Sequence, residues 1–267
     1  MELIDTHCHI DVEEFDEDRE RVLDHCRQTG ITRMIVPAVM AKTWDHLTTV
    51  CIDAPGLYPA YGLHPIYTDH HSDADLLALE KRLQDSRPIA VGEIGLDFYY
   101  KKELSDSDRL KQQTLFDAQL AMAQENKLPV VLHVRKAHDA VLMALRRTPV
   151  VGGTCHAFNG SLEQAHRYID MGFKLGFGGM LTYERSHKLH RLAKELPIDS
   201  LVLETDAPDM TVASHHGERN SPEYLPECLA ALAQTRGDSL EYVAEHTTKN
   251  AESVFSFDSV ESSVNDT

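Results

Sequence analysis

The stretch Leu3-Ile-Asp-Thr-His-Cys-His-Ile10 decides how this chain of 267 residues folds. It begins as a short apolar run and ends in polar residues, as expected of a buried strand that reaches the edge of a sheet. A doubly wound open sheet normally has a glycine-rich turn after its first strand, and no such turn follows Ile10. The absence of this turn favours a closed barrel over an open sheet.

Short runs rich in valine, isoleucine and leucine recur along the chain and alternate with longer amphipathic segments. This alternation is typical of repeated βα units on a parallel sheet. Eight parallel strands in a chain of this length predict a (β/α)8 TIM barrel, a fold of the α/β class. The eight runs are Leu3 to Cys8, Thr32 to Val36, Leu57 to Leu63, Ile89 to Glu93, Val130 to Val134, Val150 to His156, Phe173 to Phe177 and Leu201 to Thr205.

Amphipathic helices are expected over Asp108 to Glu125 and over Ser161 to Met171, the second with Ser161 as its N-cap. Two more are expected after the last strand, with Gly237 between them. We expect residues 1–255 to form one domain and the serine- and acid-rich residues 256–267 to form a flexible tail. The apolar face of the first helix comprises Leu110, Leu115, Ala118 and Met122, and the last two helices cover Ser221 to Thr235 and Ser239 to Phe255.

The composition indicates a soluble, cytoplasmic protein, and a monomer is favoured. The first residues lack a basic region followed by an apolar run, and no stretch near 18 apolar residues occurs, so neither export nor a membrane span is expected. The five cysteines are odd in number and scattered along the chain, which fits reduced thiols better than a disulfide framework.

The formal charge of −17 limits the possible partners, since 26 Lys and Arg face 43 Asp and Glu. The surface field repels polyanions, so tight nonspecific binding of long duplex nucleic acid is not expected. Divalent cations held in a cleft would reverse the sign locally and attract a phosphate. The charge therefore does not exclude an enzyme that acts on nucleic acid.

Histidines and carboxylates concentrate at the ends of the predicted strands. In barrels of this type the catalytic groups lie at the carboxyl ends of the strands, and six of the eight runs end in such residues. Side chains at these positions are expected at or inside the barrel mouth. The six ends are His7-Cys-His9, Gly62-Leu-His-Pro65, Gly92-Glu-Ile-Gly-Leu-Asp97, His133-Val-Arg135, His156 and Glu204-Thr-Asp-Ala-Pro208.

These groups suggest a metal centre. Alternation along a strand puts His7 and His9 on the same side, so both imidazoles can face the barrel axis. Four imidazoles and two carboxylates in one apolar mouth would carry a severe desolvation cost unless they bound metal. The number of groups suits two divalent ions, with Glu93 as the bridging carboxylate. The predicted metal ligands are His7, His9, Glu93, His133, His156 and Asp206.

Other residues near the predicted mouth have two interpretations. Arg135 lies two residues beyond His133 and could hold a phosphate with its fork of donors, or form a surface ion pair. His64, followed by proline, could belong to a rigid turn or reach the scissile phosphate. The loop Phe98-Tyr-Tyr-Lys-Lys102 could stack a base and hold a phosphate, or be an ordinary exposed loop.

The motifs resemble the TatD family of metal-dependent deoxyribonucleases, and most closely its YjjV-like branch, from Leu3 to about Phe255. The sixth strand end reads His156-Ala-Phe-Asn-Gly160 where many family members have His-Cys-Phe-Ser-Gly, and Asp209 stands where many have an apolar residue. The matching segments are Ile4-Asp-Thr-His-Cys-His9, Tyr61-Gly-Leu-His-Pro65, Val91-Gly-Glu-Ile-Gly-Leu-Asp97, His133-x-Arg135, His156-x-Phe-x-Gly160, Leu203-Glu-Thr-Asp-Ala-Pro208 and Arg219-Asn-x-Pro222.

The resemblance implies a hydrolase of the metallo-dependent, amidohydrolase-like superfamily, with the same six metal ligands. It further implies a magnesium-dependent 3′-to-5′ exonuclease that acts on DNA, sometimes RNA, at single-stranded or 3′ ends. Four imidazoles suit zinc or manganese better than magnesium, which prefers oxygen ligands. The identity of the two divalent ions, Mg, Mn or Zn, therefore stays open.

The expected reaction is hydrolysis of a phosphodiester by a two-metal-activated water. Glu93 positions the ions, Asp206 accepts the proton of the water, and Arg135 and His64 stabilise charge on the phosphate. Two alternatives remain: a hydrolase of the same superfamily that acts on an amide, lactone, phosphotriester or aminoacyl ester, and a noncatalytic metal-binding protein. An open coordination position argues against the second.

Overall fold

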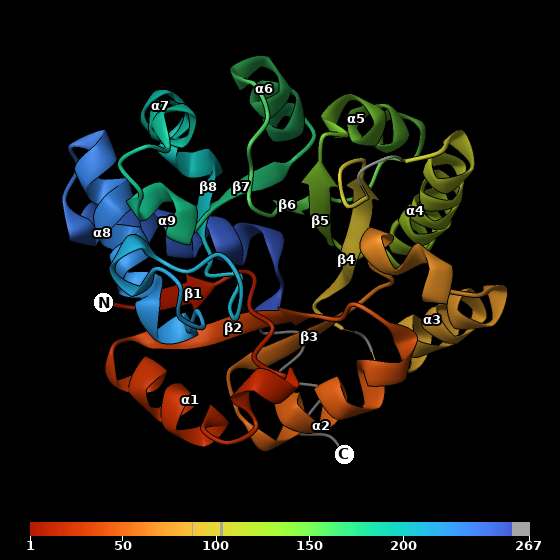
Figure 1. Cartoon of the computed structure of the whole chain (residues 1–267), viewed down its shortest axis with the longest axis horizontal. Coiled ribbons are helices and arrows are strands. Elements are labelled where there is room, and N and C mark those ends of the chain that lie inside the picture. The colour runs from red at the N-terminus through yellow and green to blue at the C-terminus, as the bar shows by residue number, and fades with distance from the viewer. Residues whose placement is uncertain (87, 102–103, 258–267) are drawn as a thin grey trace.

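Eight parallel strands form a single sheet in the order β1 to β8, with the helices packed around its outside (Figure 1). The computed structural model describes residues 1–86, 88–101 and 104–257. The predicted (β/α)8 barrel is confirmed. The strands are β1 (Leu3–Asp5), β2 (Ile31–Pro37), β3 (Leu57–Tyr61), β4 (Ala90–Asp97), β5 (Val130–Arg135), β6 (Gly153–Cys155), β7 (Phe173–Phe177) and β8 (Leu201–Leu203).

Backbone hydrogen bonds between the first and last strands close the sheet into a barrel. The amide of Thr6 donates to the carbonyl of Leu203 over 3.0 Å, and two more bonds follow beyond the strand ends. The amide of Asp206 donates to the carbonyl of His7 at 2.8 Å, and the amide of His9 donates to the carbonyl of Ala207 at 2.8 Å. Backbone hydrogen bonds therefore hold together the two segments that carry the predicted ligands after the first and eighth strands.

The helices alternate with the strands, and two follow the last strand, as expected (Figure 1). The predicted N-cap is confirmed, because the hydroxyl of Ser161 accepts from the amide of Gln164 at 3.1 Å. Gly237 ends α8 in a left-handed conformation with φ 76°. The helices are α1 (Arg19–Gln28), α2 (Trp44–Asp53), α3 (Asp73–Ser86), α4 (Asp106–Asn126), α5 (His138–Arg147), α6 (Leu162–Asp170), α7 (His187–Glu195), α8 (Leu225–Arg236) and α9 (Leu240–Val254).

Short 3-10 helices fill several of the connections between strands and helices. The 3-10 helices are Glu13–Phe15, Ala41–Thr43, Pro65–His70, Gly179–Thr182, Ile198–Ser200, Ala213–His215 and Pro222–Tyr224.

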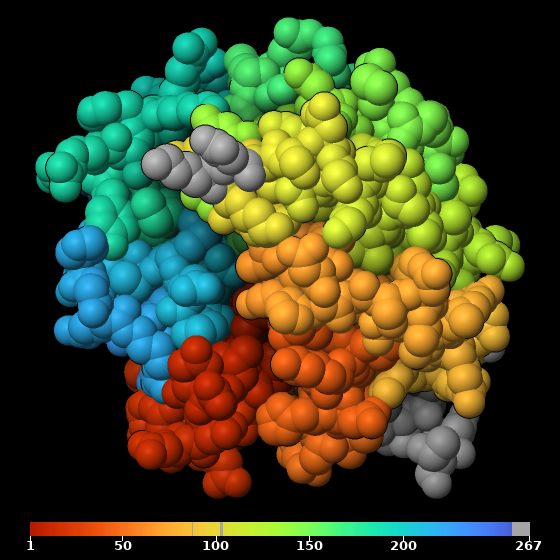
Figure 2. All heavy atoms as spheres, turned by 45° about the vertical axis from the view of Figure 1, so that its right-hand side comes forward, coloured from red at the N-terminus to blue at the C-terminus, as the bar shows by residue number. Residues whose placement is uncertain are grey.

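The space-filling view shows that the surface is hollowed near its middle, where the red, yellow and blue parts of the chain meet (Figure 2). Within the described residues no helix is both long and apolar enough to cross a membrane.

Two strand boundaries differ from the prediction in ways that affect the mouth. Strand β1 ends at Asp5, so His7 and His9 lie beyond the strand rather than on it. Strand β4 continues to Asp97, four residues past Glu93. Its pairing with β5 shifts between Val91 and Ile94, and such irregularities re-aim a side chain without ending the strand. Glu93 therefore reaches the mouth from within a strand.

The buried face of α4 differs from the predicted one. Leu110 is 67% exposed, whereas Gln112 and Gln119 are fully buried. Each glutamine exchanges two hydrogen bonds with the backbone of one residue: Gln112 with Asp97 at 2.9 and 3.0 Å, and Gln119 with Leu63 at 2.7 and 3.1 Å. Apolar periodicity misplaced part of the buried face, because the helix uses the side-chain amides of two glutamines to bind the buried backbone of Leu63 and Asp97.

The predicted flexible tail, residues 256–267, is described only in part. Phe257 is 3% exposed, and its ring lies 4.8 Å from that of Tyr58 and beneath the guanidinium of Arg33. Residues 258–267 lie outside the described residues. The chain is thus packed against the bottom of the barrel as far as Phe257, two residues past the expected domain boundary.

Replacing Gln119 with alanine should lower the free energy of unfolding by about 2–4 kcal/mol, because it leaves a buried amide and a buried carbonyl of Leu63 without partners. Urea unfolding followed by circular dichroism measures the loss. Gln113→Ala is the matched control, since among the described residues the side chain of Gln113 bonds only Asp117 on the same helix, and it should change stability by less than about 0.5 kcal/mol. Equal losses in both variants would contradict this interpretation of α4.

Candidate metal centre

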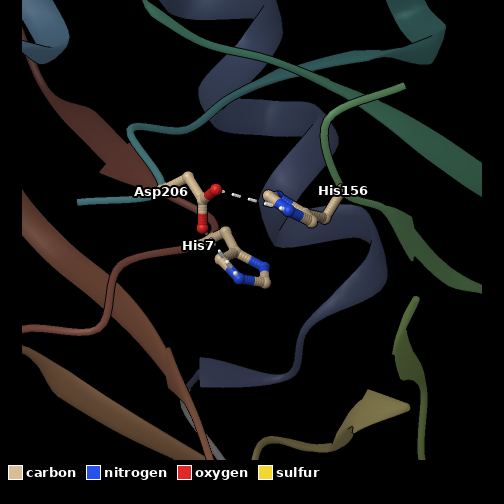
Figure 3. Close-up of side chains that lie close together, drawn as sticks. All are labelled: His7, His156 and Asp206. Carbon is tan, nitrogen blue, oxygen red and sulfur yellow. Dashed lines mark ion pairs between the residues drawn. The ribbon is translucent and has the colours of Figure 1, made fainter. Parts of the chain in front are cut away.

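Six side chains from strands far apart in sequence converge in the barrel mouth. His7 and His9 follow β1, Glu93 lies in β4, and His133 lies in β5. His156 directly follows β6, and Asp206 lies in the loop after β8. Figure 3 shows the carboxylate of Asp206 beside the imidazoles of His7 and His156 and turned toward both. The structure thus brings together all six of the residues predicted as metal ligands.

Four of these side chains direct one ligand atom each toward a common point. The Nε2 atoms of His7 and His9 lie 3.2 Å apart. Glu93 Oε2 lies 3.3 and 3.6 Å from these two nitrogens, and Asp206 Oδ1 lies 3.5 and 3.8 Å from them. Ligands about 2.1 Å from a tetrahedral ion are about 3.4 Å from one another. The spacing of this quartet therefore fits a divalent cation.

The second oxygen of Glu93 faces a different set of imidazoles. Glu93 Oε1 lies 2.9 Å from His133 Nδ1 and 3.2 Å from His64 Nε2. Asp206 divides its oxygens similarly, because its Oδ2 lies 3.7 Å from His156 Nε2. One carboxylate that serves two neighbouring groups of ligand atoms is the arrangement expected of a bridge between two ions.

Three of the imidazoles have an acceptor beside their other nitrogen, and two of them form a hydrogen bond with it. His9 Nδ1 lies 3.0 Å from the carbonyl of Pro37, and His133 Nε2 lies 3.0 Å from Asp97 Oδ2. His156 Nδ1 lies 3.2 Å from Glu204 Oε1. The carbonyl of Pro37 and the carboxylate of Asp97 accept the N–H of His9 and of His133, so the lone pair of the remaining nitrogen points into the cluster. His156 contacts Glu204 without a hydrogen bond. Partners of this kind are typical of metal-binding histidines.

His64 acts on the cluster through Glu93. Its Nδ1 accepts from the amide of Ile66 at 3.2 Å, so the ring hydrogen lies on Nε2 and points at Glu93 Oε1. Burial lowers the pKa of His64 to about 4, which keeps the ring neutral. His64 therefore caps the turn that begins at Pro65, as one of the two interpretations predicted, and its Nε2–H points at Glu93. Contact of His64 with a scissile phosphate stays a prediction.

Three carboxylates that the sequence analysis did not select support the predicted ligands. Asp5 is fully buried and accepts from the amide of His7 at 3.1 Å and from Thr205 Oγ1 at 2.6 Å, so it ties the two ends of the barrel together. Asp97 and Glu204 hold His133 and His156. The sequence did contain a signal for these acids, because a carboxylate two residues from a predicted ligand, or within a buried strand, is unusual. Closeness along the sequence did not show, however, which side chain each acid contacts.

Three local features give Glu204 and Asp206 their positions. A Cβ on Gly176 would lie 2.0 Å from Glu204 Oε2, so only glycine leaves space for this buried carboxylate. Asp206 has φ 58°, a left-handed conformation that aspartate tolerates better than most residues. The side chain of Asn220 donates to the carbonyls of Thr205 and Asp209, at 2.8 and 2.6 Å, and so fixes the loop around Asp206.

The electrostatics of the cluster favour added positive charge. Burial opposes ionisation of Glu93, yet the surrounding imidazoles hold the pKa of this carboxyl well below its usual range. Burial disfavours charged imidazoles, but Asp97 and Glu93 raise the pKa of His133 to about 9, and Asp206 and Glu204 raise the pKa of His156 to about 10. Protons on these rings compensate the carboxylates in the absence of a cation.

The residues present therefore fit divalent cations. Imidazole nitrogen and carboxylate oxygen are the ligands that zinc and manganese accept readily. Among the residues that the structure describes, three groups have ligand atoms within 4.8 Å of one another; the first two groups share His7, and the last two share Glu93. They are His7, His156 and Asp206; His7, His9 and Glu93; and His64, Glu93 and His133.

Two hollows adjoin the cluster. An apolar cavity of about 310 Å³ lies between β7, β8 and α7 and has Asp206 and Glu204 in its wall. A polar groove of about 820 Å³ is lined by Tyr99, Arg135 and Lys188 among others. The structure places Arg135 in this groove, with its guanidinium 4.7 Å from the ring centre of Tyr99, and Arg135 forms no ion pair with any residue that the structure describes. Lys102 lies outside the described residues.

A barrel with a histidine and carboxylate cluster at the carboxyl ends of its strands defines the class of metal-dependent hydrolases. Residues 4–256 match the family described as TatD related DNase, and the chain belongs to this family. It is 38% identical to the metal-dependent hydrolase YjjV of Escherichia coli K12, over 94% of this chain and 97% of that protein. It is also 31% identical to the 3′-5′ ssDNA/RNA exonuclease TatD of Pantoea vagans, over 91% of this chain and 95% of that protein.

Solved structures agree with this assignment. The crystal structure of YjjV from Escherichia coli superposes with a TM-score of 0.89, at 38% identity, over 95% of this chain and 98% of that one. An organophosphate hydrolase engineered from a lactonase shares the fold with a TM-score of 0.67 at 15% identity, over 95% of both chains. The chain is thus a metal-dependent hydrolase of the TatD family.

Asp97→Asn should weaken binding of divalent cations about 10- to 100-fold, because an amide no longer provides a charged acceptor for His133. Isothermal titration calorimetry with Mn²⁺ measures the affinity. Asp85→Asn, on the exposed end of α3, changes the charge equally and should bind as the wild type does. An unchanged affinity in Asp97→Asn would show that Asp97 does not support the site.

Metal binding at pH 7 should release at least one proton per protein molecule, because the raised pKa values of His133 and His156 leave both rings protonated until a cation replaces the proton. Since these values lie above neutral pH, affinity should rise as pH increases from 6 toward 9. Calorimetric titrations in buffers of different ionisation enthalpy give the number of protons. A value of zero would contradict the assigned charge state.

Proposed function

We propose that this protein hydrolyses phosphodiester bonds of DNA and removes nucleotides from the 3′ end of a single strand. The observation that carries the proposal is the donor cluster around Glu93, whose two oxygens face separate groups of imidazoles. The activity named for the Pantoea vagans relative, which covers nearly the whole chain, supports the substrate class and the direction.

The cluster would hold two divalent cations. His7 and His9 would bind one of them, His133 the other, and Glu93 would bind both, while His156 and Asp206 complete the set. When bound, the cations supply an activated water and stabilise the negative charge on the phosphate and the leaving oxygen. Asp97, Glu204 and the carbonyl of Pro37 keep the imidazoles oriented for this purpose.

Asp206 is the residue that we assign as proton acceptor. Burial raises the pKa of its carboxyl to about 6, so the group is ionised at neutral pH but remains basic enough to take a proton. Its carboxylate also lies in the wall of the apolar cavity. His64 acts indirectly here, since its Nε2–H holds Glu93.

Oligonucleotides labelled at the 3′ or the 5′ end, single- or double-stranded, test the proposal directly when incubated with the purified protein and Mg²⁺, Mn²⁺ or Zn²⁺ in turn. We expect stepwise shortening from the 3′ end of the single strand. Failure to cut any oligonucleotide, together with turnover of a lactone or phosphotriester, would instead assign the protein to another reaction of the same barrel.

Asp206→Asn should lower the rate of cleavage at least 100-fold while metal binding changes much less, because the carboxylate acts on the proton of the water. Glu93→Ala should lose metal and rate together, since Glu93 contacts both groups of ligands. Asp209→Asn, in the same loop but exposed, is the control and should keep both. Near-normal turnover in Asp206→Asn would refute its assigned role.

A further inference from the structure

The groove beside the metal cluster carries an unusual concentration of positive charge. Arg135, at the end of β5, is followed by Lys136, and Lys188 approaches from α7 across the groove. Within residues 1–86, 88–101 and 104–257, none of these three side chains forms an ion pair. Elsewhere on this acidic chain, cations such as Arg33 and Arg219 are held by carboxylates.

The two lysines lie close enough to repel each other. Burial and the nearby charge of Lys136 lower the pKa of Lys188. Lys188 donates one hydrogen bond, to the carbonyl of Asn159, which leaves two of its three N–H groups without a protein acceptor among the described residues. Asp139 also lines the groove, but its Oδ1 accepts from Gln164 at 3.0 Å. An anion in the groove would relieve this repulsion.

An aromatic ring forms the other part of the groove. The guanidinium of Arg135 stacks on Tyr99, and the Tyr99 side chain remains 59% exposed. Exposed aromatic rings next to cations are the platforms on which proteins stack unpaired bases. Bases within a duplex are covered on both faces, so only a single strand can use such a platform.

The groove lies next to the metal cluster. The amide of Tyr99 donates to Asp97 Oδ1 at 2.7 Å, and Asp97 Oδ2 binds His133 at 3.0 Å. On the other side, Asn159 and Lys188 line both the groove and the apolar cavity beside Asp206. A ligand in the groove would therefore lie beside the reaction site.

We propose that this groove binds the phosphates of a single-stranded nucleic acid next to the scissile bond, with Lys136 and Lys188 on the phosphates and Tyr99 stacked on a base. The inference rests on the proposed function and adds the residues that select the form of substrate. It moves Arg135 from the scissile phosphate to the neighbouring part of the strand, where its guanidinium lies over Tyr99.

The test is fluorescence anisotropy of a labelled, hydrolysis-resistant phosphorothioate oligothymidylate with the metal-loaded protein. The double variant Lys136→Gln, Lys188→Gln should bind roughly tenfold more weakly, and the slope of log affinity against log salt should fall in magnitude by about 1.4, for two lost phosphate contacts. Tyr99→Leu should weaken binding roughly tenfold without changing the salt slope. Lys194→Gln lies on the same helix outside the groove and should bind as the wild type does.

The outcomes separate this inference from the proposed function. If the wild type binds and cleaves single strands but the double variant keeps its affinity and salt slope, the groove is not the binding site. If Tyr99→Leu binds normally and a blunt duplex binds as tightly as the single strand, the single-strand assignment is wrong. If the wild type neither binds nor cuts any oligonucleotide, the proposed function fails first. Equal thermal midpoints for all variants verify that each is folded.

Discussion

The burial of two carboxylates among imidazoles is the constraint on which the rest of this structure depends. Glu93 is 2% exposed, and moving an ionised carboxylate out of water costs several kcal/mol unless opposite charge compensates it. His7 and His9 gather around one oxygen of Glu93 and His133 around the other. A divalent cation bound here would compensate the charge of Glu93 and coordinate the imidazoles around it, which explains why so many ionisable groups are buried in an apolar barrel.

Much of the surrounding structure serves to keep that cluster rigid. Asp5 joins the ends of β1 and β8, and the two buried glutamines of α4 hold the backbone after β3 and at the end of β4. Gly176 leaves space for Glu204, which in turn contacts His156. Deeply buried side chains that do not line the reaction site thus set the orientation of the metal ligands that do.

The sequence predicted the barrel and the six converging residues because both follow from short-range rules: apolar runs mark strands, and catalytic groups lie at their carboxyl ends. It misplaced the face of α4, since Gln112 is buried for its hydrogen bonds and Leu110 is exposed. It put His7 on a strand that ends at Asp5. It named Asp97 and Glu204 among the strand-end residues but assigned them no role, because what a carboxylate contacts across the barrel depends on three-dimensional packing, which local patterns do not contain.

The central claim is that the side chains around Glu93 hold divalent cations. Anomalous diffraction from crystals of the protein loaded with Mn²⁺, measured near the manganese edge, tests it most directly. The account predicts two peaks in the barrel mouth, one beside each oxygen of the Glu93 carboxylate. Manganese bound only at the protein surface, with no peak among these side chains, would contradict it.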